Sequence, residues 1–145
     1  MGTVRPMNYP LTPVVAIHLF AALAALSLGP LAIWARRGAV TRPKLHRAFG
    51  YAWVTVMVAT AVSAMFIRDY RLPNIWGYTP IHLFVLLTAK GLFDAFYQLS
   101  KGNIAGHRKA MQGLYYGACL GAGAFTLLPS RYLGNLVWHQ WLGLI

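Results

Sequence analysis

The chain has 145 residues, of which 58% are hydrophobic and only 10% are charged, and its mean hydropathy is +0.52. These values exclude an ordinary soluble domain of this size and predict an integral membrane protein. The formal net charge of +11 does not predict a nucleic-acid-binding protein, because the cations gather in short joints beside apolar segments.

Four mostly apolar segments follow one another along the chain, and each is long enough to cross a bilayer. We predict transmembrane helices at residues 12–35, 45–67, 80–99 and 107–128. The predicted fold class is all-α, an integral membrane four-helix bundle made from a duplicated two-helix hairpin. A single transmembrane domain would cover residues 1–145, with repeat one at about 12–67, repeat two at about 80–128 and an interfacial helical tail at 130–145.

The cations predict an orientation in the membrane. Eight of them surround the first and third joints: Arg36, Arg37, Arg42, Lys44, Arg47, Lys101, Arg108 and Lys109. Four lie at the opposite ends of the segments: Arg5, Arg68, Arg71 and Arg131. The positive-inside rule therefore places the two joints in the cytoplasm and both termini outside.

The two halves of the chain share sequence motifs. Ile-His-Leu-Phe occurs at residues 17–20 and 81–84, and His-Arg occurs at residues 46–47 and 107–108. A glycine, Gly50 or Gly113, follows each His-Arg pair after a short interval. A repeat of two helices keeps its direction, so the copies would be related by a pseudo-twofold axis along the membrane normal.

This symmetry gives the histidines a predicted arrangement at two levels. In an up-and-down bundle the first and third helices lie diagonally opposite, as do the second and fourth. We therefore expect His18 to face His82 near the outside and His46 to face His107 near the inside. The two levels would lie roughly 20 Å apart along the helices, which suits two stacked cofactors.

Pairs of histidines on facing apolar helices are typical ligands of haem iron. We predict one or two haem b groups per chain, with all four histidines as hypothetical iron ligands. Arg47 and Arg108 would pair with haem propionates, and Gly50 and Gly113 would let the porphyrin approach the helix backbone. The same histidines also suit copper, a chlorophyll-type pigment or a quinone.

A purely structural interpretation competes with this one. A His-Arg pair at the start of a span also occurs where both side chains simply reach the headgroups. Duplication would copy histidines whether or not they bind a ligand, and the glycines also suit close helix packing. Four ionisable residues at symmetric membrane positions nevertheless favour a functional role.

The third segment carries a charged pair that breaks the repeat. Lys90 and Asp94 are one helical turn apart, and we expect them to face the bundle interior, a water cavity or a partner subunit. They are a candidate proton site or partner site. Pro30 predicts a distortion of the first helix.

The motifs together resemble a family of predicted bacterial membrane proteins that is defined by a domain of unknown function. The resemblance covers roughly Ala16 to Arg131, and His46, Arg47, His107 and Arg108 carry it best. It implies a four-helix membrane protein of the bacterial inner membrane and no established activity. The design is also similar to that of b-type transmembrane cytochromes, which is an analogy only.

The leading hypothesis is a b-type haem-binding membrane protein that transfers electrons across or within the membrane, as a subunit of a larger redox complex. The alternative is a non-catalytic structural or assembly subunit, and a small transporter ranks third. The expected partners are the lipid bilayer and other membrane proteins or a second copy, with quinone as a further candidate and no nucleic acid. The sequence predicts no catalytic residues and leaves open whether the protein is an enzyme.

Overall fold

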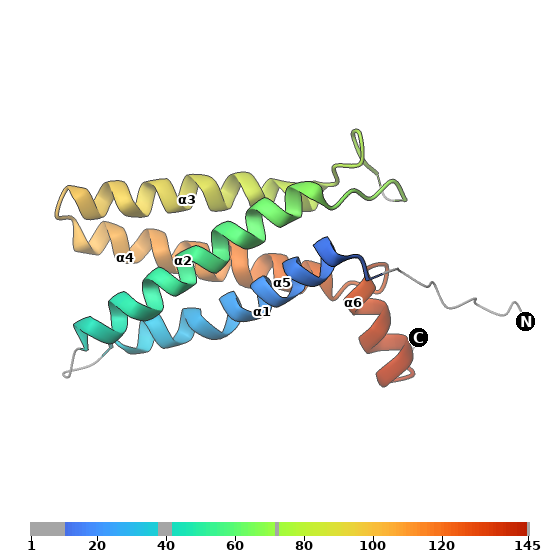
Figure 1. Ribbon diagram of the computed structural model, residues 1–145, viewed down its shortest axis with the longest axis horizontal. Helices are drawn as coiled ribbons and strands as arrows, with labels where there is room; N and C mark the ends of the chain where they lie inside the picture. The colour runs from blue at the N-terminus through green and yellow to red at the C-terminus, as the bar shows by residue number, and fades with distance from the viewer. Residues whose placement is uncertain (1–10, 38–41, 72, 145) are drawn as a thin grey trace, which may run out of the picture.

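The structure is a computed structural model that describes residues 11–37, 42–71 and 73–144. The described residues are mostly helical and contain no strand, apart from an isolated bridge between Ile75 and Tyr78. The prediction of an all-α protein is therefore confirmed. Figure 1 shows the long helices running lengthwise through the molecule and a short helix crossing them near the C-terminus.

The helical elements occupy the segments in which the sequence predicts helices. The first two are α1 (Pro13–Trp34) and α2 (Pro43–Phe66), and a 3-10 turn, η1 (Pro80–His82), leads into α3 (Leu83–Ser100). The fourth predicted helix is divided into α4 (Ile104–Gly113), a π-helical segment η2 (Leu114–Cys119) and α5 (Leu120–Thr126). The tail also forms a short helix, with α6 (Tyr132–Asn135) followed by the π-helical η3 (Leu136–Trp141).

Local sequence signals explain where these helices begin. The Thr12 hydroxyl caps α1 by accepting a hydrogen bond from the Val15 amide at 3.3 Å, and Pro13 occupies the first helical position. The Asn103 side chain caps α4 by accepting from the Gly106 amide at 2.9 Å. Gly102, with φ of +70°, makes the left-handed residue of the tight turn between α3 and α4.

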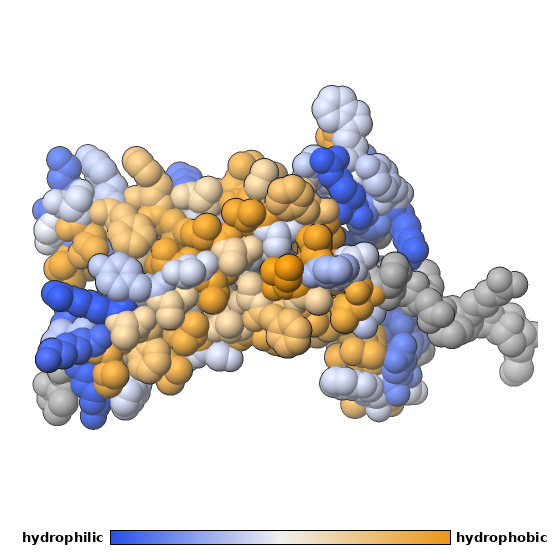
Figure 2. Space-filling view, in the orientation of Figure 1, coloured by the Kyte–Doolittle hydropathy of each residue, from blue (hydrophilic) through white to orange (hydrophobic). Residues whose placement is uncertain are grey.

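Two helices, α1 and α2, are long and apolar enough to cross a membrane. Their 22 and 24 residues correspond to about 33 and 36 Å of helix, against about 30 Å of hydrocarbon in a bilayer. On the face that Figure 2 shows, apolar side chains cover most of the middle of the molecule and hydrophilic side chains gather at both ends. Large apolar side chains of the long helices, such as Phe20 of α1 and Phe93 of α3, are 72% and 70% exposed, as suits a surface that contacts lipid.

The helices contact one another in a closed order. Helix α1 packs on α2, α2 packs on α3 and α3 packs on α4, while η2 contacts both α1 and α3. A small buried core lies where these elements meet: Ala25, Trp53, Met57, Leu114, Tyr115 and Ala118.

Small residues on α1 and α3 make this packing possible. A Cβ atom added to Gly29 would collide with the Tyr115 ring and lie 3.2 Å from the Trp53 indole nitrogen. A Cβ atom added to Gly91 would collide with the Leu114 side chain. Neighbouring residues of η2 therefore seat against two different helices, Leu114 on α3 and Tyr115 on α1.

Helix α1 continues through Pro30, and side chains of two other elements hydrogen-bond its carbonyls nearby. Proline has no amide hydrogen, so the Leu26 carbonyl four residues earlier loses its usual helical donor. The Tyr115 hydroxyl donates to that carbonyl at 3.2 Å, and the Trp53 indole donates to the adjacent Ala25 carbonyl at 3.0 Å. Side chains from α2 and η2 thus hydrogen-bond carbonyls of α1 within an apolar core, where an unpaired carbonyl is costly.

Candidate functional site

The two inner histidines make the same contact in both halves of the chain. His46, near the start of α2, donates from Nδ1 to the Ala32 carbonyl of α1 at 2.9 Å. His107, near the start of α4, donates from Nδ1 to the Ala95 carbonyl of α3, also at 2.9 Å. Each histidine is therefore held by a backbone carbonyl of the preceding helix in its own hairpin.

This contact determines which ring nitrogen carries the proton. A carbonyl oxygen only accepts hydrogen bonds, so Nδ1 of His46 and His107 must carry the hydrogen. In the neutral ring Nε2 then has a free lone pair, and within the described chain no group hydrogen-bonds to Nε2 of either residue. A histidine that binds a metal through Nε2 is commonly oriented by this type of Nδ1 hydrogen bond.

The inner level also contains the predicted glycines and cations. A Cβ atom added to Gly50 or Gly113 would meet nothing within 4 Å, so both helices offer open backbone there. Arg47 and Arg108, one residue after the histidines, are exposed. The two histidines belong to different hairpins, and the hydrogen bonds found for them in the described residues go to Ala32 and Ala95 and not to each other.

At the outer level, the contacts of His18 resemble those of the inner histidines. Its Nδ1 donates to the Thr60 carbonyl of α2 at 3.0 Å and lies 3.0 Å from the Ser63 hydroxyl, which itself donates to Thr60. Its Nε2 has no hydrogen-bond partner within residues 11–37, 42–71 and 73–144.

His82 differs from the other three because both of its ring nitrogens have partners. The Thr79 amide donates to Nδ1 at 3.0 Å, and Nε2 donates to the Ile67 carbonyl at 3.0 Å. The ring also contacts Tyr78 edge-on, with centroids 5.0 Å apart. His82 in this arrangement has no lone pair available for a metal.

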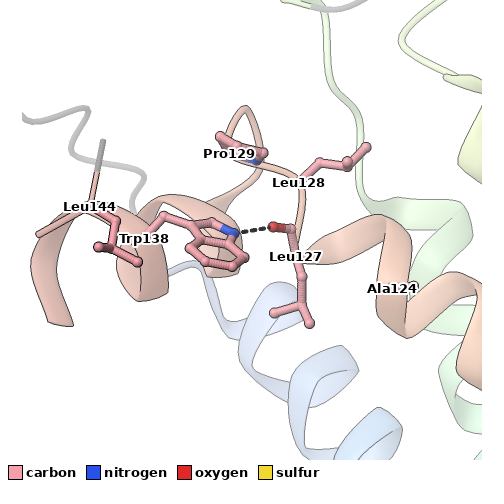
Figure 3. A pocket seen from close by; sticks show the side chains of 6 residues that line it. All are labelled: Ala124, Leu127, Leu128, Pro129, Trp138 and Leu144. Carbon is pink, nitrogen blue, oxygen red and sulfur yellow. Dashed lines mark hydrogen bonds between the residues drawn. The ribbon is translucent and has the colours of Figure 1, made fainter. Parts of the chain in front are cut away.

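Two cavities lie at the end of the molecule where α2 and α5 end and α3 begins. His82 lines an apolar groove of about 660 Å³ between the end of α2, the 73–80 loop and the start of α3. A second apolar pocket, of about 490 Å³, lies between the end of α5 and the C-terminal helix, where the Trp138 indole donates to the Leu127 carbonyl at 2.7 Å (Figure 3). The second pocket has no polar side chain besides Trp138 and is not part of the histidine arrangement.

Lys90 and Asp94 form an ion pair on the surface of α3 and do not face the core. Their side chains are 73% and 42% exposed. Of the three environments expected from the sequence, the bundle interior is therefore ruled out in the single chain. The only other acid, Asp69, pairs with Arg131 at 3.6 Å and joins the 67–79 connection to the start of α6.

Sequence reasoning did not single out Trp53, Tyr115 or Gly29 as a connected group. The available signal was Pro30 inside an apolar helix, which requires a hydrogen-bond donor from elsewhere for the carbonyl it exposes. In the described residues no group of three or more His, Cys, Asp or Glu side chains gathers to hold a metal ion. A bis-histidine haem site needs only two such ligands.

No curated protein and no solved structure matches the chain. A family model described as "Predicted membrane protein (DUF2306)" matches residues 15–133, which is most of the chain and includes all four histidines of the two levels. This is the family that the motifs resemble. The chain therefore belongs to this family of predicted membrane proteins.

Proposed function

We propose that this protein is a b-type haem-binding membrane protein that transfers electrons within or across a bacterial inner membrane. In this proposal the four long helical segments span the bilayer as an up-and-down bundle. The joints at residues 35–42 and 101–103 face the cytoplasm, and both termini face the periplasm. The observation that carries the proposal is the identical orientation of His46 and His107 by carbonyls of their own hairpins.

The four-span arrangement is supported by the order of the helix contacts and by the surface. Each long segment packs on the next, and η2 returns to α1, as in a bundle of antiparallel neighbours. On the face that Figure 2 shows, apolar side chains cover most of the middle of the molecule. The third span would contain Lys90 and Asp94, and these two charges interrupt its apolar sequence.

The inner level fits haem ligation in its donor chemistry. His46 and His107 would each present Nε2, and their Nδ1 hydrogen bonds would keep the rings oriented and raise the basicity of the ligating nitrogen. Gly50 and Gly113 would leave space beside the helix backbones, while Arg47 and Arg108 would neutralise acidic groups of the cofactor. A bound haem would supply one-electron transfer, and these residues would tune its potential.

The residues of the outer level suit haem ligation less well than those of the inner level, because of the hydrogen bonds of His82. The His18 ring is oriented by an Nδ1 hydrogen bond to a backbone carbonyl, as are the rings of the inner histidines. For His82 to bind haem iron through Nε2, its hydrogen bond to the Ile67 carbonyl would have to break. Because an unpaired carbonyl in an apolar site is costly, binding at this level should be weaker. We therefore expect haem to bind first at the inner site and to occupy the outer site to a lower extent.

The test is haem content in detergent-purified protein from haem-supplied cells, measured by a pyridine haemochrome assay and by oxidised and reduced spectra. We expect at least one haem per wild-type chain, and we expect the His46→Ala and His107→Ala variants to lose the inner haem while remaining helical and membrane-inserted. His139→Ala is the matched control, because this histidine lies in η3 outside both levels. Unchanged haem content in both inner variants, or a colourless wild type, would refute the proposal.

A second candidate function is a non-catalytic structural or assembly subunit, favoured by the exposed Lys90–Asp94 pair. It predicts a colourless protein whose co-purifying membrane partners are lost in the Lys90→Leu variant. The same purified sample distinguishes the two candidates, since only the first requires a visible spectrum.

A further inference from the structure

One end of the molecule carries a group of cations that no acidic side chain offsets. Figure 1 shows that α1 and α3 end, and α2 and α4 begin, at this same end. Besides Arg47 and Arg108, which the haem proposal uses, six exposed cations lie there, and we call them the inner cations: Arg36, Arg37, Arg42, Lys44, Lys101 and Lys109. The only two acids of the chain, Asp69 and Asp94, each pair with a different cation.

The inner cations have few contacts with the rest of the fold. Within the part of the chain that the structure describes, none of them forms an ion pair or a side-chain hydrogen bond. The Arg42 guanidinium lies over the Trp34 ring, 4.6 Å from its centroid. The Lys101 ammonium lies 5.6 Å from the centroid of the Tyr97 ring. A cation over an aromatic face keeps its charge and its hydrogen-bond donors, so the inner cations offer both to a group outside the chain.

The cations at the opposite end are instead engaged by the chain itself. Arg131 pairs with Asp69 at 3.6 Å. Arg68 donates to the Trp76 carbonyl at 2.8 Å and lies 4.2 Å from the centroid of the Tyr78 ring. The two ends therefore differ in the contacts of their cations as well as in their number. Because like charges at one end repel one another, an anionic surface outside the chain would stabilise the inner end.

Exposed apolar side chains border the inner cations. Four of them lie within three residues of an inner cation in the sequence: Trp34, Leu45, Leu99 and Ile104. In the four-span arrangement proposed above, this border lies where the hydrocarbon layer meets the headgroups. The surface thus offers cations to an anionic headgroup and apolar side chains to the acyl chains attached to it. A nucleic acid or an acidic soluble protein would match only the cations.

We propose that the inner cations bind anionic phospholipids of the surrounding bilayer, such as phosphatidylglycerol, in preference to phospholipids without net charge. The lipid phosphates would contact the arginine and lysine side chains, and the acyl chains would lie against the neighbouring apolar side chains. The proposal rests on the four-span arrangement but not on haem. A colourless protein would therefore leave it untouched, and a lack of lipid preference would leave the haem proposal untouched.

The test measures the lipid selectivity of the full chain by electron spin resonance. The purified protein is reconstituted in phosphatidylcholine vesicles with a trace of spin-labelled phosphatidylglycerol or spin-labelled phosphatidylcholine. The motionally restricted fraction of each label gives its relative association constant, and the result does not depend on orientation because both leaflets contain the label. We expect the wild type to favour phosphatidylglycerol roughly fivefold at low ionic strength, which corresponds to about 1 kcal/mol for a contacted cation, and much less in concentrated salt.

Two matched variants locate the preference in the molecule, and each removes two positive charges. The inner variant carries Lys101→Gln and Lys109→Gln, and its preference should fall from roughly fivefold to roughly threefold, because two of the six inner cations are lost. The outer variant carries Arg68→Gln and Arg71→Gln, and it should keep the wild-type preference. Circular dichroism of each variant checks that the helices remain folded.

A fourfold variant strengthens the test. Adding Arg36→Gln and Arg37→Gln to the inner variant should lower the preference to less than about twofold. Equal association of the two labelled lipids with the wild type would overturn the proposal, as would an equal loss of preference in the inner and outer variants or an unchanged preference in the fourfold variant. Displacement of the labelled lipid by soluble glycerophosphoglycerol would also overturn it, because the inner cations would then bind the headgroup anion without its acyl chains.

Discussion

Removing the Tyr115 hydroxyl should lower the free energy of unfolding by more than the loss of an ordinary hydrogen bond between two helices does. The Tyr115→Phe variant keeps the ring against Gly29 and deletes only the donor to the Leu26 carbonyl. Pro30 has already removed the other donor of that carbonyl, so no helical amide can replace the hydroxyl. We expect a loss of about 1–2 kcal/mol, the upper part of the range for hydrogen bonds between membrane helices.

A double-mutant cycle isolates the cause. In a Pro30→Ala background, residue 30 regains an amide that can bond to Leu26, so Tyr115→Phe should then cost less than about 0.5 kcal/mol. The assay is reversible unfolding in mixed micelles, followed by circular dichroism. Tyr116→Phe is the control, because this neighbouring tyrosine is exposed and its hydroxyl has no hydrogen bond to the described residues.

Two results would refute this reasoning. If Tyr115→Phe costs the same in both backgrounds, the hydroxyl does not compensate for Pro30. If Tyr115→Phe is no more harmful than Tyr116→Phe, the contact at 3.2 Å contributes nothing to stability.

Two further predictions concern packing. Gly29→Ala should lower the melting temperature, at a cost of roughly 1–3 kcal/mol, because the added methyl group collides with the Tyr115 ring. Gly123→Ala should leave stability unchanged or slightly raised, because a Cβ there meets nothing within 4 Å, and an equal loss in both variants would contradict the close approach at Gly29. Arg131→Gln should release the C-terminal helix from Asp69 and speed hydrogen exchange in residues 132–141 without affecting α1, whereas unchanged exchange there would show that the ion pair does not hold the helix.

The sequence was a good guide to the helices because their lengths are set by apolar runs and by helix-start residues. Thr12 and Pro13 mark the start of α1, and Asn103 marks the start of α4 close to the predicted position. The all-α class and the family follow from the same patterns. The number of spans was harder to predict, because Lys90 and Asp94 interrupt the apolar run of α3 and because the fourth predicted helix is divided into shorter elements.

The details of the candidate site could be predicted only in part. The repeat pointed to the residues of both levels, but only the structure reveals that His46 and His107 are oriented by carbonyls while His82 uses both ring nitrogens. The contacts of His82 depend on the connection between α2 and α3, because that connection places the Ile67 carbonyl beside the His82 ring. Sequence periodicity does not predict the path of such a connection. Sequence periodicity also did not predict the π-helical form of η2, in which Leu114 packs against α3 and Tyr115 packs against α1.

The hydrogen bond between Tyr115 and Leu26 also bears on the order in which the protein is made. The ribosome delivers α1 and α2 first, and Trp53 arrives with α2 to cover the Ala25 carbonyl. The Leu26 carbonyl has no donor until Tyr115 follows about ninety residues later in the chain. The hairpin of α1 and α2 would therefore leave the translocon with the Leu26 carbonyl unpaired in its apolar middle. The carbonyl gains its hydrogen bond from Tyr115 only when the last long segment arrives. Biogenesis of this protein should thus favour keeping the two hairpins together at the insertion site, and a truncated chain that ends before η2 should be a preferred substrate of membrane proteases.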